Sequence, residues 1–275
     1  MAFSDNTLLR VAMTSVGLVA GAACTDDARH AKGGPPCPAD GTCVTNLASA
    51  GATTGAGGGG GGGAAAVDVS GVVAVLISST FDQSQLYAGE ATVVADQAGG
   101  GTVSAPWGGD AGALFTLHGV ASNARWLLVD NSASASAIVA TYSTLVLSAS
   151  ATVTAPVVDT GVLDTVAGAL LPPVAIDPSA AQIILALTRS GAPLAGVRVS
   201  SPPSGAVVAY DQGAGAYSTD ALATGAGGII LLLNVPASTA QASDVTLAVN
   251  DAQPKTFALP IRLRGHTATV AHFAL

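Results

Sequence analysis

The stretch TFALPIRLRGHTATVAHF, residues 256–273, decides the fold expected for this chain. Its first half alternates between apolar and other side chains, as a strand does when one face is buried and the other meets water. The apolar face carries Phe257, Leu259, Ile261 and Leu263, and the opposite face carries Thr256, Arg262 and Arg264. A second strand is expected over residues 267–273.

Strands of this kind are expected along most of the chain, because short runs of Val, Thr and Ser alternate with Gly, Pro and Asn. We expect them at 67–73, 90–96, 101–105, 113–117, 125–130, 137–148 and 152–158, then at 181–189, 196–200, 205–210, 228–235 and 244–250. Residues 161–173 are expected to form a short helix or a crossing loop that Pro172 and Pro173 end. The sequence predicts an all-β protein with two tandem sandwich domains, 67–177 and 178–275, that meet near Pro178.

The composition excludes one class of partner. Of 275 residues only nine are Lys or Arg, and the net charge is −8. Charged residues make up 9% of the chain, against about 25% in typical soluble domains. There is no basic stripe to neutralise phosphates, so we expect no nucleic-acid partner.

The N-terminal segment has the pattern of an export signal. Residues 11–23 (VAMTSVGLVAGAA) follow Arg10 and are apolar, too short to span a bilayer and of the length of a signal-peptide core. We expect residues 1–23 to be cleaved. The sequence Gly21-Ala22-Ala23-Cys24 resembles the bacterial lipobox, which implies lipid on Cys24 and a membrane anchor. The alternative is a secreted protein, cut nearby, with a free thiol at Cys24.

Two further cysteines favour an oxidising compartment. Cys37 and Cys43 bracket the turn-like PADGT, and an exported chain can join such a pair in a small disulfide loop. That leaves Cys24 for lipid. With only His30 nearby, the two cysteines fall short of the four ligands of a usual zinc site, so we expect no metal and no cofactor.

Residues 24–66 are expected to form a tether. They are rich in Gly, Ala, Pro, Ser and Thr and include an unbroken glycine run at 57–63. The run lacks the Lys-Ser/Thr pair of a phosphate-binding loop. As a flexible coil the segment would reach roughly 35 Å, which would hold folded domains clear of a membrane.

The run GAPLAGVRV, residues 191–199, carries a resemblance to known modules. It looks like the G-x-P-L-x-G-V-x-V opening of carboxypeptidase-regulatory-like, transthyretin-like and immunoglobulin-like modules. The likeness covers residues 179–275 well and the first domain more weakly, through Val69-x-Gly71-x-Val73. It implies immunoglobulin-like or prealbumin-like sandwiches and, with the lipobox and tether, resembles a family of bacterial surface lipoproteins. It implies no peptidase activity, because no catalytic domain accompanies the module.

Motifs of common enzymes are missing: the chain has no G-x-S-x-G, H-E-x-x-H or EF-hand loop. Trp107, Asp110 and His118 are a candidate sugar site, since a tryptophan ring stacks on sugar C–H groups and a carboxylate accepts hydroxyls. The alternative, which we favour, is a half-buried tryptophan at the sandwich edge. Arg262 and Arg264 share a solvent face that could contact an acidic polymer, although an ordinary solvated face is the simpler interpretation.

Other chemistry-bearing residues receive structural interpretations. Tyr210 and Tyr217 flank a hairpin and are expected to pack across it. Asp211 is expected to form a turn rather than to bind calcium. His266 and His272 lie six residues apart on one expected strand, roughly 20 Å at the rise of a strand, too far to share a metal.

The function that these observations favour is a non-enzymatic, lipid-anchored binding or adhesion module of the cell surface or outer membrane. Loops at the sandwich ends would contact an envelope protein, a polysaccharide or a neighbouring cell. One alternative is a structural spacer of the envelope, and a more remote one is a carbohydrate-binding or hydrolytic accessory protein. The sequence leaves open the ligand, the oligomeric state and the choice between periplasm and cell exterior.

Overall fold

The structure is a computed structural model, and it describes residues 66–96, 101–109, 114–130, 137–145, 147 and 152–275. The described residues belong to one compact unit. Strands dominate them and a single short helix accompanies the strands, so the predicted all-β class is confirmed. Among the described residues, no helix is long and apolar enough to cross a membrane.

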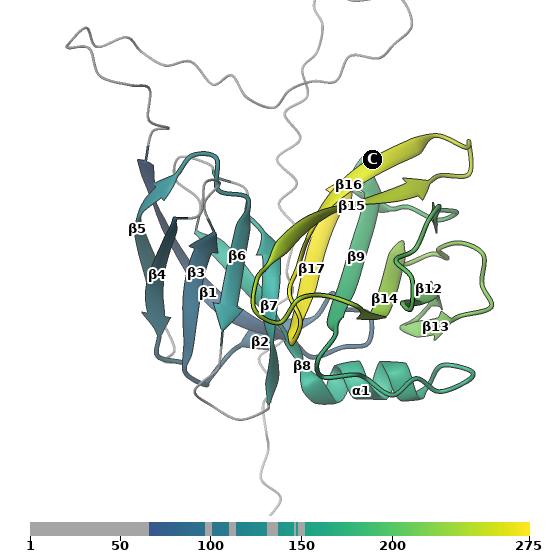
Figure 1. Cartoon of the computed structure of the whole chain (residues 1–275), viewed down its shortest axis with the longest axis horizontal. Coiled ribbons are helices and arrows are strands. Elements are labelled where there is room, and N and C mark those ends of the chain that lie inside the picture. The colour runs from purple at the N-terminus through teal and green to yellow at the C-terminus, as the bar shows by residue number, and fades with distance from the viewer. Residues whose placement is uncertain (1–65, 97–100, 110–113, 131–136, 146, 148–151) are drawn as a thin grey trace, which may run out of the picture. The chain divides into compact units, whose positions relative to one another are not determined.

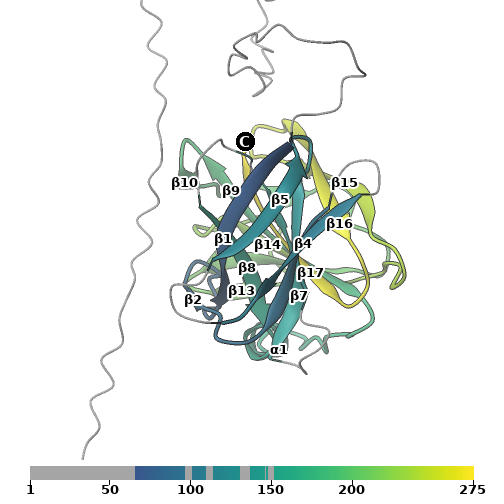
Figure 2. The same ribbon diagram turned by 90° about the vertical axis from the view of Figure 1, so that its left-hand side faces the viewer.

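The first part of the chain folds into two layers of strands (Figure 1). The strands described before the helix are β1 (Ala66–Leu76), β2 (Ser84–Leu86), β3 (Ala91–Asp96), β4 (Thr102–Trp107), β5 (Phe115–Ala121), β6 (Trp126–Asp130), β7 (Ile138–Thr144) and β8 (Val153–Asp159). One layer has the order β4-β3-β6-β7, and in the other β1 pairs with β2, β5 and β8. The layers cross at an angle (Figure 2), and between them lie fully buried residues such as Val73, Val93, Leu117 and Val129.

The second part begins with the helix and adds two further groups of strands. Its elements are α1 (Thr160–Gly168), β9 (Ala181–Arg189), β10 (Ala192–Pro193), β11 (Arg198–Val199), β12 (Val207–Gly213), β13 (Ala216–Ser218), β14 (Ile229–Val235), β15 (Ser243–Asn250), β16 (Thr256–Leu263) and β17 (Thr267–Ala274). The helix begins where the Asp159 carboxylate accepts a hydrogen bond from the N–H of Val162. Of the two alternatives expected here, a short helix or a crossing loop, the chain forms the helix, and this N-cap stabilises its first turn.

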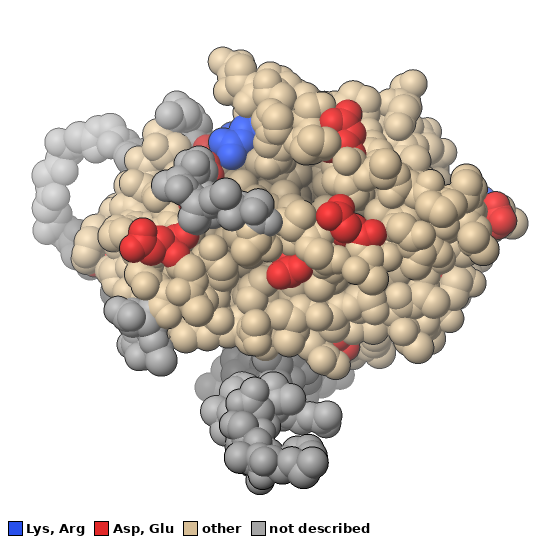
Figure 3. Space-filling model, turned by 90° about the horizontal axis from the view of Figure 1, so that it is seen from below, with Lys and Arg blue, Asp and Glu red and all other residues tan. Residues whose placement is uncertain are grey.

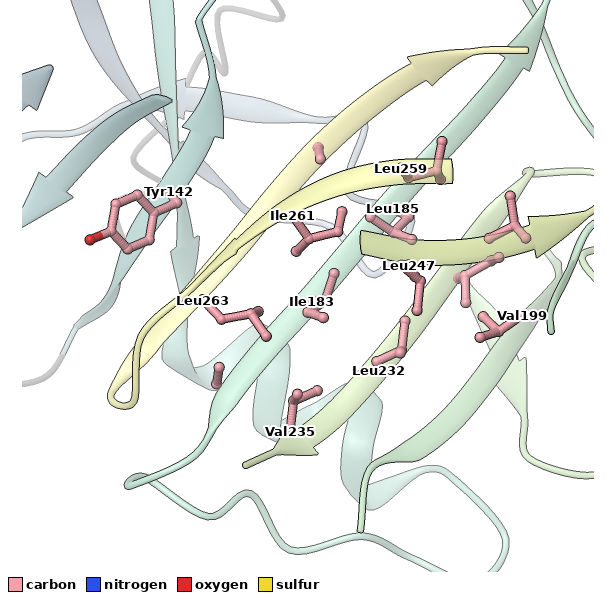
Figure 4. Packing of buried hydrophobic residues seen from close by; sticks show 14 of the residues in the cluster. Tyr142, Ile183, Leu185, Val199, Leu232, Val235, Leu247, Leu259, Ile261 and Leu263 are labelled. Atoms are coloured by element: carbon pink, nitrogen blue, oxygen red, sulfur yellow. The ribbon is translucent and has the colours of Figure 1, made fainter. Parts of the chain in front are cut away.

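Strands β9 and β14 are buried on both faces, which explains their almost unbroken apolar runs. On one face, Ile183 packs with Leu247 and Ile261 of β15 and β16 (Figure 4). On the other face, Ile184 packs with Leu163 of α1. The second part therefore has three layers, and its central sheet lies between a small three-stranded sheet and the helix.

The two parts are joined through β17. This strand runs parallel to β7 of the first part, with Thr267 opposite Ala140, and parallel to β9 of the second, with Ala268 opposite Gln182. Strands from both sides of Pro178 thus share one hydrogen-bonded sheet. A boundary near Pro178 stays a prediction about how the chain divides into folding units.

The alternation predicted for β16 is confirmed on its apolar face. Leu259, Ile261 and Leu263 are buried and point toward the side chains of β9 (Figure 4). The opposite face is not fully exposed to solvent, because Arg262 and Arg264 form ion pairs with carboxylates of the first part. That arrangement borders the candidate site.

Candidate functional site

A cavity of about 560 Å³ opens where several elements of both parts end. Its polar lining consists of Asp130, Thr160, Asp164, Asp177, Gln182, Thr239, Arg264 and His266. Its apolar and small lining consists of Ile138, Val139, Ala140, Leu163, Ile176, Pro178, Ala180 and Gly265. The volume lies within the range of roughly 300 to 1,000 Å³ of small-molecule sites, which also combine an apolar wall with a few polar groups.

The turn between β16 and β17 carries three of the lining residues. Gly265 is packed so closely that a Cβ there would lie 2.5 Å from the carbonyl oxygen of Ser179. His266 has a positive φ of 62°, a backbone conformation uncommon outside glycine. Its Nδ1 lies 2.6 Å from the carbonyl oxygen of Pro178. Because a carbonyl oxygen can only accept, Nδ1 is the protonated nitrogen and donates a hydrogen bond to that oxygen. The turn is thereby fixed against residues 178–179.

A buried amide network positions the segment before β9. Gln182 is only 2% exposed, and its Oε1 accepts the N–H of Asn234 at 2.8 Å. The Asn234 side chain accepts the N–H of Asp177 and donates to the carbonyl of Ala175, both at 2.8 Å. Asn234 also has a positive φ of 57°. The connection that carries Asp177 is therefore tied to the end of β14.

The Asp177 carboxylate is held in its ionised form. It accepts hydrogen bonds from the hydroxyl of Ser179 at 2.7 Å and from the N–H of the same residue at 2.8 Å. These bonds, with the hydroxyl contributing most, lower the pKa of Asp177 below its ordinary value. Asp177 thus brings a negative charge to the rim at neutral pH.

The two arginines of β16 and its following turn have different surroundings. Arg262 pairs with Asp96 of β3 and, through Nη1 at 3.1 Å, with Asp244 of β15; its side chain is 19% exposed. Arg264 lies beside the cavity, with Nη2 3.4 Å from Asp130 and its guanidinium 5.8 Å from the ring centre of Tyr142. Burial raises the pKa of Tyr142. The prediction that Arg262 and Arg264 share an open, solvated face is wrong, because both arginines form ion pairs with carboxylates of the same chain.

The charge around the cavity is predominantly acidic. Asp130, Asp164 and Asp177 outnumber the single guanidinium of Arg264, whose charge Asp130 already faces. The face of the molecule on which α1 lies is largely uncharged, with separate acidic spots and little basic surface (Figure 3). A net negative potential is therefore expected at the entrance.

The residues of the expected sugar site are not assembled as one. Trp107 is 2% exposed and its Nε1 donates to the carbonyl of Tyr87 at 2.9 Å, so its ring face is within the core. Asp110 lies outside the described residues. His118 is exposed and pairs at 3.0 Å with Asp68, which lowers the pKa of that carboxyl.

Other predicted residues have varied outcomes. Cys24, Cys37 and Cys43 lie outside the described residues, so the lipid and disulfide predictions stay predictions. The expected packing between Tyr210 and Tyr217 is wrong, since Tyr210 is opposite Ser218 and the two rings lie on opposite faces of their hairpin. Tyr210 accepts the N–H of Val199, whereas Tyr217 donates to the carbonyl of Ser79.

Asp211 has the turn role that its neighbours indicated. Its buried carboxylate accepts the N–H groups of Gly213 at 2.8 Å and Gly227 at 2.9 Å, which fixes the corner between β12 and β14. The described part of the chain contains no group of three or more metal-ligating side chains. The expectation that the protein holds no metal stays a prediction.

No model of a known protein family matches this chain, and no curated protein is similar to it in sequence.

Proposed function

We propose that this chain is an exported, lipid-anchored surface protein that binds a ligand without transforming it, and that the cavity is its binding site. The observation that carries the proposal is the position of the cavity. The end of β6, the start of β7, the start of α1 and the turn before β17 converge on it. Loops held by a rigid sheet commonly carry binding residues. The cavity also belongs to both parts of the fold, so both are needed to form it.

The polar contacts favour binding over catalysis. Nδ1 of His266 donates a hydrogen bond to the carbonyl oxygen of Pro178. This bond orients the ring but activates no nucleophile. Asp177 accepts from Ser179, and Asp130 pairs with Arg264. These contacts organise charge at the rim, and the carboxylate that accepts the Ser179 hydroxyl is a weak base because its pKa is lowered.

The anchor is supported by the sequence. The apolar segment 11–23, the lipobox-like ending at Cys24 and the glycine-rich residues 24–66 together fit a lipid attached to a long spacer. Intact mass measurement of the protein from a bacterial membrane fraction tests this. A mature start at Cys24 with acyl chains, and two hydrogens gained on reduction, is expected; an unmodified soluble species would overturn the anchor.

Two matched tryptophan substitutions test the site. Thr239→Trp places a large ring on the exposed rim of the cavity, whereas Thr246→Trp places the same ring on the exposed face of β15 away from it. Binding of the purified mature chain to envelope fragments is measured by sedimentation. We expect Thr239→Trp to weaken binding at least tenfold and Thr246→Trp to leave it unchanged.

Equal binding by the two variants would place the binding surface elsewhere and overturn the cavity as the site. If the unaltered chain bound no envelope fragment and formed ordered oligomers, the alternative of a structural spacer would replace the binding function.

A further inference from the structure

We infer that the cavity binds an ammonium group carried on a short aliphatic stem, such as a lysine-like side chain or an alkyl diamine. The inference rests on the proposed binding function and adds the chemical class of the ligand. It follows from three features of the lining: the position of its carboxylates, the engagement of its cations and the character of its floor.

The carboxylates approach the cavity from different elements. Asp164 projects from α1 and Asp177 from the connection before β9. Asp164 is exposed and makes no ion pair within the described residues. Asp177 is held ionised by Ser179. An ammonium group has three donors and no acceptor, so it suits a rim of carboxylate oxygens.

Three groups with positive or partly positive charge that could attract an anion already have partners. Arg264 faces Asp130 and lies over the ring of Tyr142. The N-terminus of α1 is capped by the carboxylate of Asp159, which reduces the positive end of the helix dipole. His266 directs its Nδ1 proton to Pro178. An incoming carboxylate or phosphate would compete with these contacts.

The floor of the cavity is suited to methylene groups. Ile138 and Leu163 are 4% and 1% exposed, and Ile176 lies beside them with part of its surface open. A straight alkyl stem can lie along such a wall while its charged end stays at the rim, as lysine side chains do at protein surfaces. A bare inorganic cation would leave this apolar wall without a partner.

Three probes with the same five-carbon stem separate the charge classes: 1,5-diaminopentane, 1,5-pentanediol and glutarate. Each is titrated into the mature chain and followed by calorimetry and by NMR of the cavity residues. We expect the diamine to bind with shifts at Leu163 and Ile138, and the diol and glutarate to bind at least tenfold more weakly.

Matched charge variants locate the effect. Asp164→Asn and Asp177→Asn are each expected to weaken diamine binding about fivefold or more. Asp220→Asn removes an equal charge from an exposed position outside the cavity and is expected to change binding less than twofold. Thermal melts and circular dichroism show that each variant is folded.

The outcomes distinguish the ligand class from the function. Glutarate binding more tightly than the diamine, equal binding of all three probes, or an equal loss in Asp220→Asn would each overturn the inference. So would a diamine that does not bind while Thr239→Trp still abolishes attachment to envelope fragments, but that result leaves the binding function in place. Failure of both tests removes the function and the ligand class together.

Discussion

Arg262 and Arg264 lie two residues apart, yet they do different work. Arg262 is enclosed between Asp96 and Asp244, one from each part of the fold, and is mostly buried. Arg264 has one longer contact, to Asp130, and a quarter of its side chain is exposed beside the cavity. Arg262 joins the two parts of the fold, at a contact that we call the seam. Arg264 instead lines the cavity, which we call the opening.

The difference teaches that a strand pattern cannot assign a role to a polar residue. Both arginines fulfil the same rule of alternation, and both are placed opposite the apolar residues of β16. What separates them is the distance to carboxylates more than a hundred residues earlier in the chain. Each role should therefore respond differently to substitution.

The largest effect is expected from the seam. Arg262→Met would leave the largely buried Asp96 without its cation, and we expect a loss of about 3 kcal/mol in the free energy of unfolding. Arg264→Met is the matched control, with an expected loss of about 1 kcal/mol or less, because its ion pair is longer and more exposed. Urea unfolding followed by tryptophan fluorescence measures both. Equal losses would break the comparison between seam and opening.

An intermediate effect is expected from the turn that carries the opening. In Gly265→Ala the added Cβ would meet the Ser179 carbonyl at 2.5 Å and the Thr239 methyl at 2.6 Å, so the turn must shift. We expect a loss of about 2 kcal/mol in unfolding free energy, as for other overpacked sites, together with weaker diamine binding.

The control for that variant is Gly168→Ala. A Cβ at this last residue of α1 meets nothing within 4 Å, so stability should be unchanged or should rise by less than about 1 kcal/mol. If Gly265→Ala is as stable and binds as well as the unaltered chain, the turn is not rigid and the geometry of the opening is less fixed than the structure indicates.

The smallest effect is a change in titration. Ser179→Ala removes the hydroxyl that contributes most to lowering the pKa of Asp177. Because folding lowers this pKa, ionised Asp177 stabilises the fold at any pH above its ordinary pKa. This stabilisation is lost as the pH falls through the lowered pKa. We expect the pKa of Asp177 in the variant to rise toward the ordinary value of an aspartate, as measured by carbon NMR of the carboxyl.

Asp68 provides the internal reference for this titration, since its own lowered pKa is due to His118, on another part of the molecule. A shift of Asp68 and Asp177 together would point to a general change in the fold and would leave Ser179 without a specific role.

Much of the strand pattern could be predicted from the sequence. The apolar run of β14 and the alternation of β16 are local signals of two different sheet environments, buried on both faces and buried on one. Short strands such as β2 and β10 were missed, because two or three residues carry no period.

The pairing of distant strands and the site could not be predicted in the same way. Nothing near residues 267–274 specifies that β17 lies parallel to β7 rather than beside β16. The cavity residues are three single acids: Asp130 at the end of a strand, Asp164 on a helix and Asp177 in a connection. Acids are common at such positions for reasons of solubility alone. Trp107 shows the converse, since its burial depends on a second layer of strands.

The position of β17 has a consequence for folding. This strand fills the gap between β7 and β9, so each of these strands presents an unpaired edge until residues 267–274 have docked. A chain in which residues 267–274 are not yet folded would carry two open edges, each able to pair with another copy. One strand therefore protects two strand edges from aggregation at the same time.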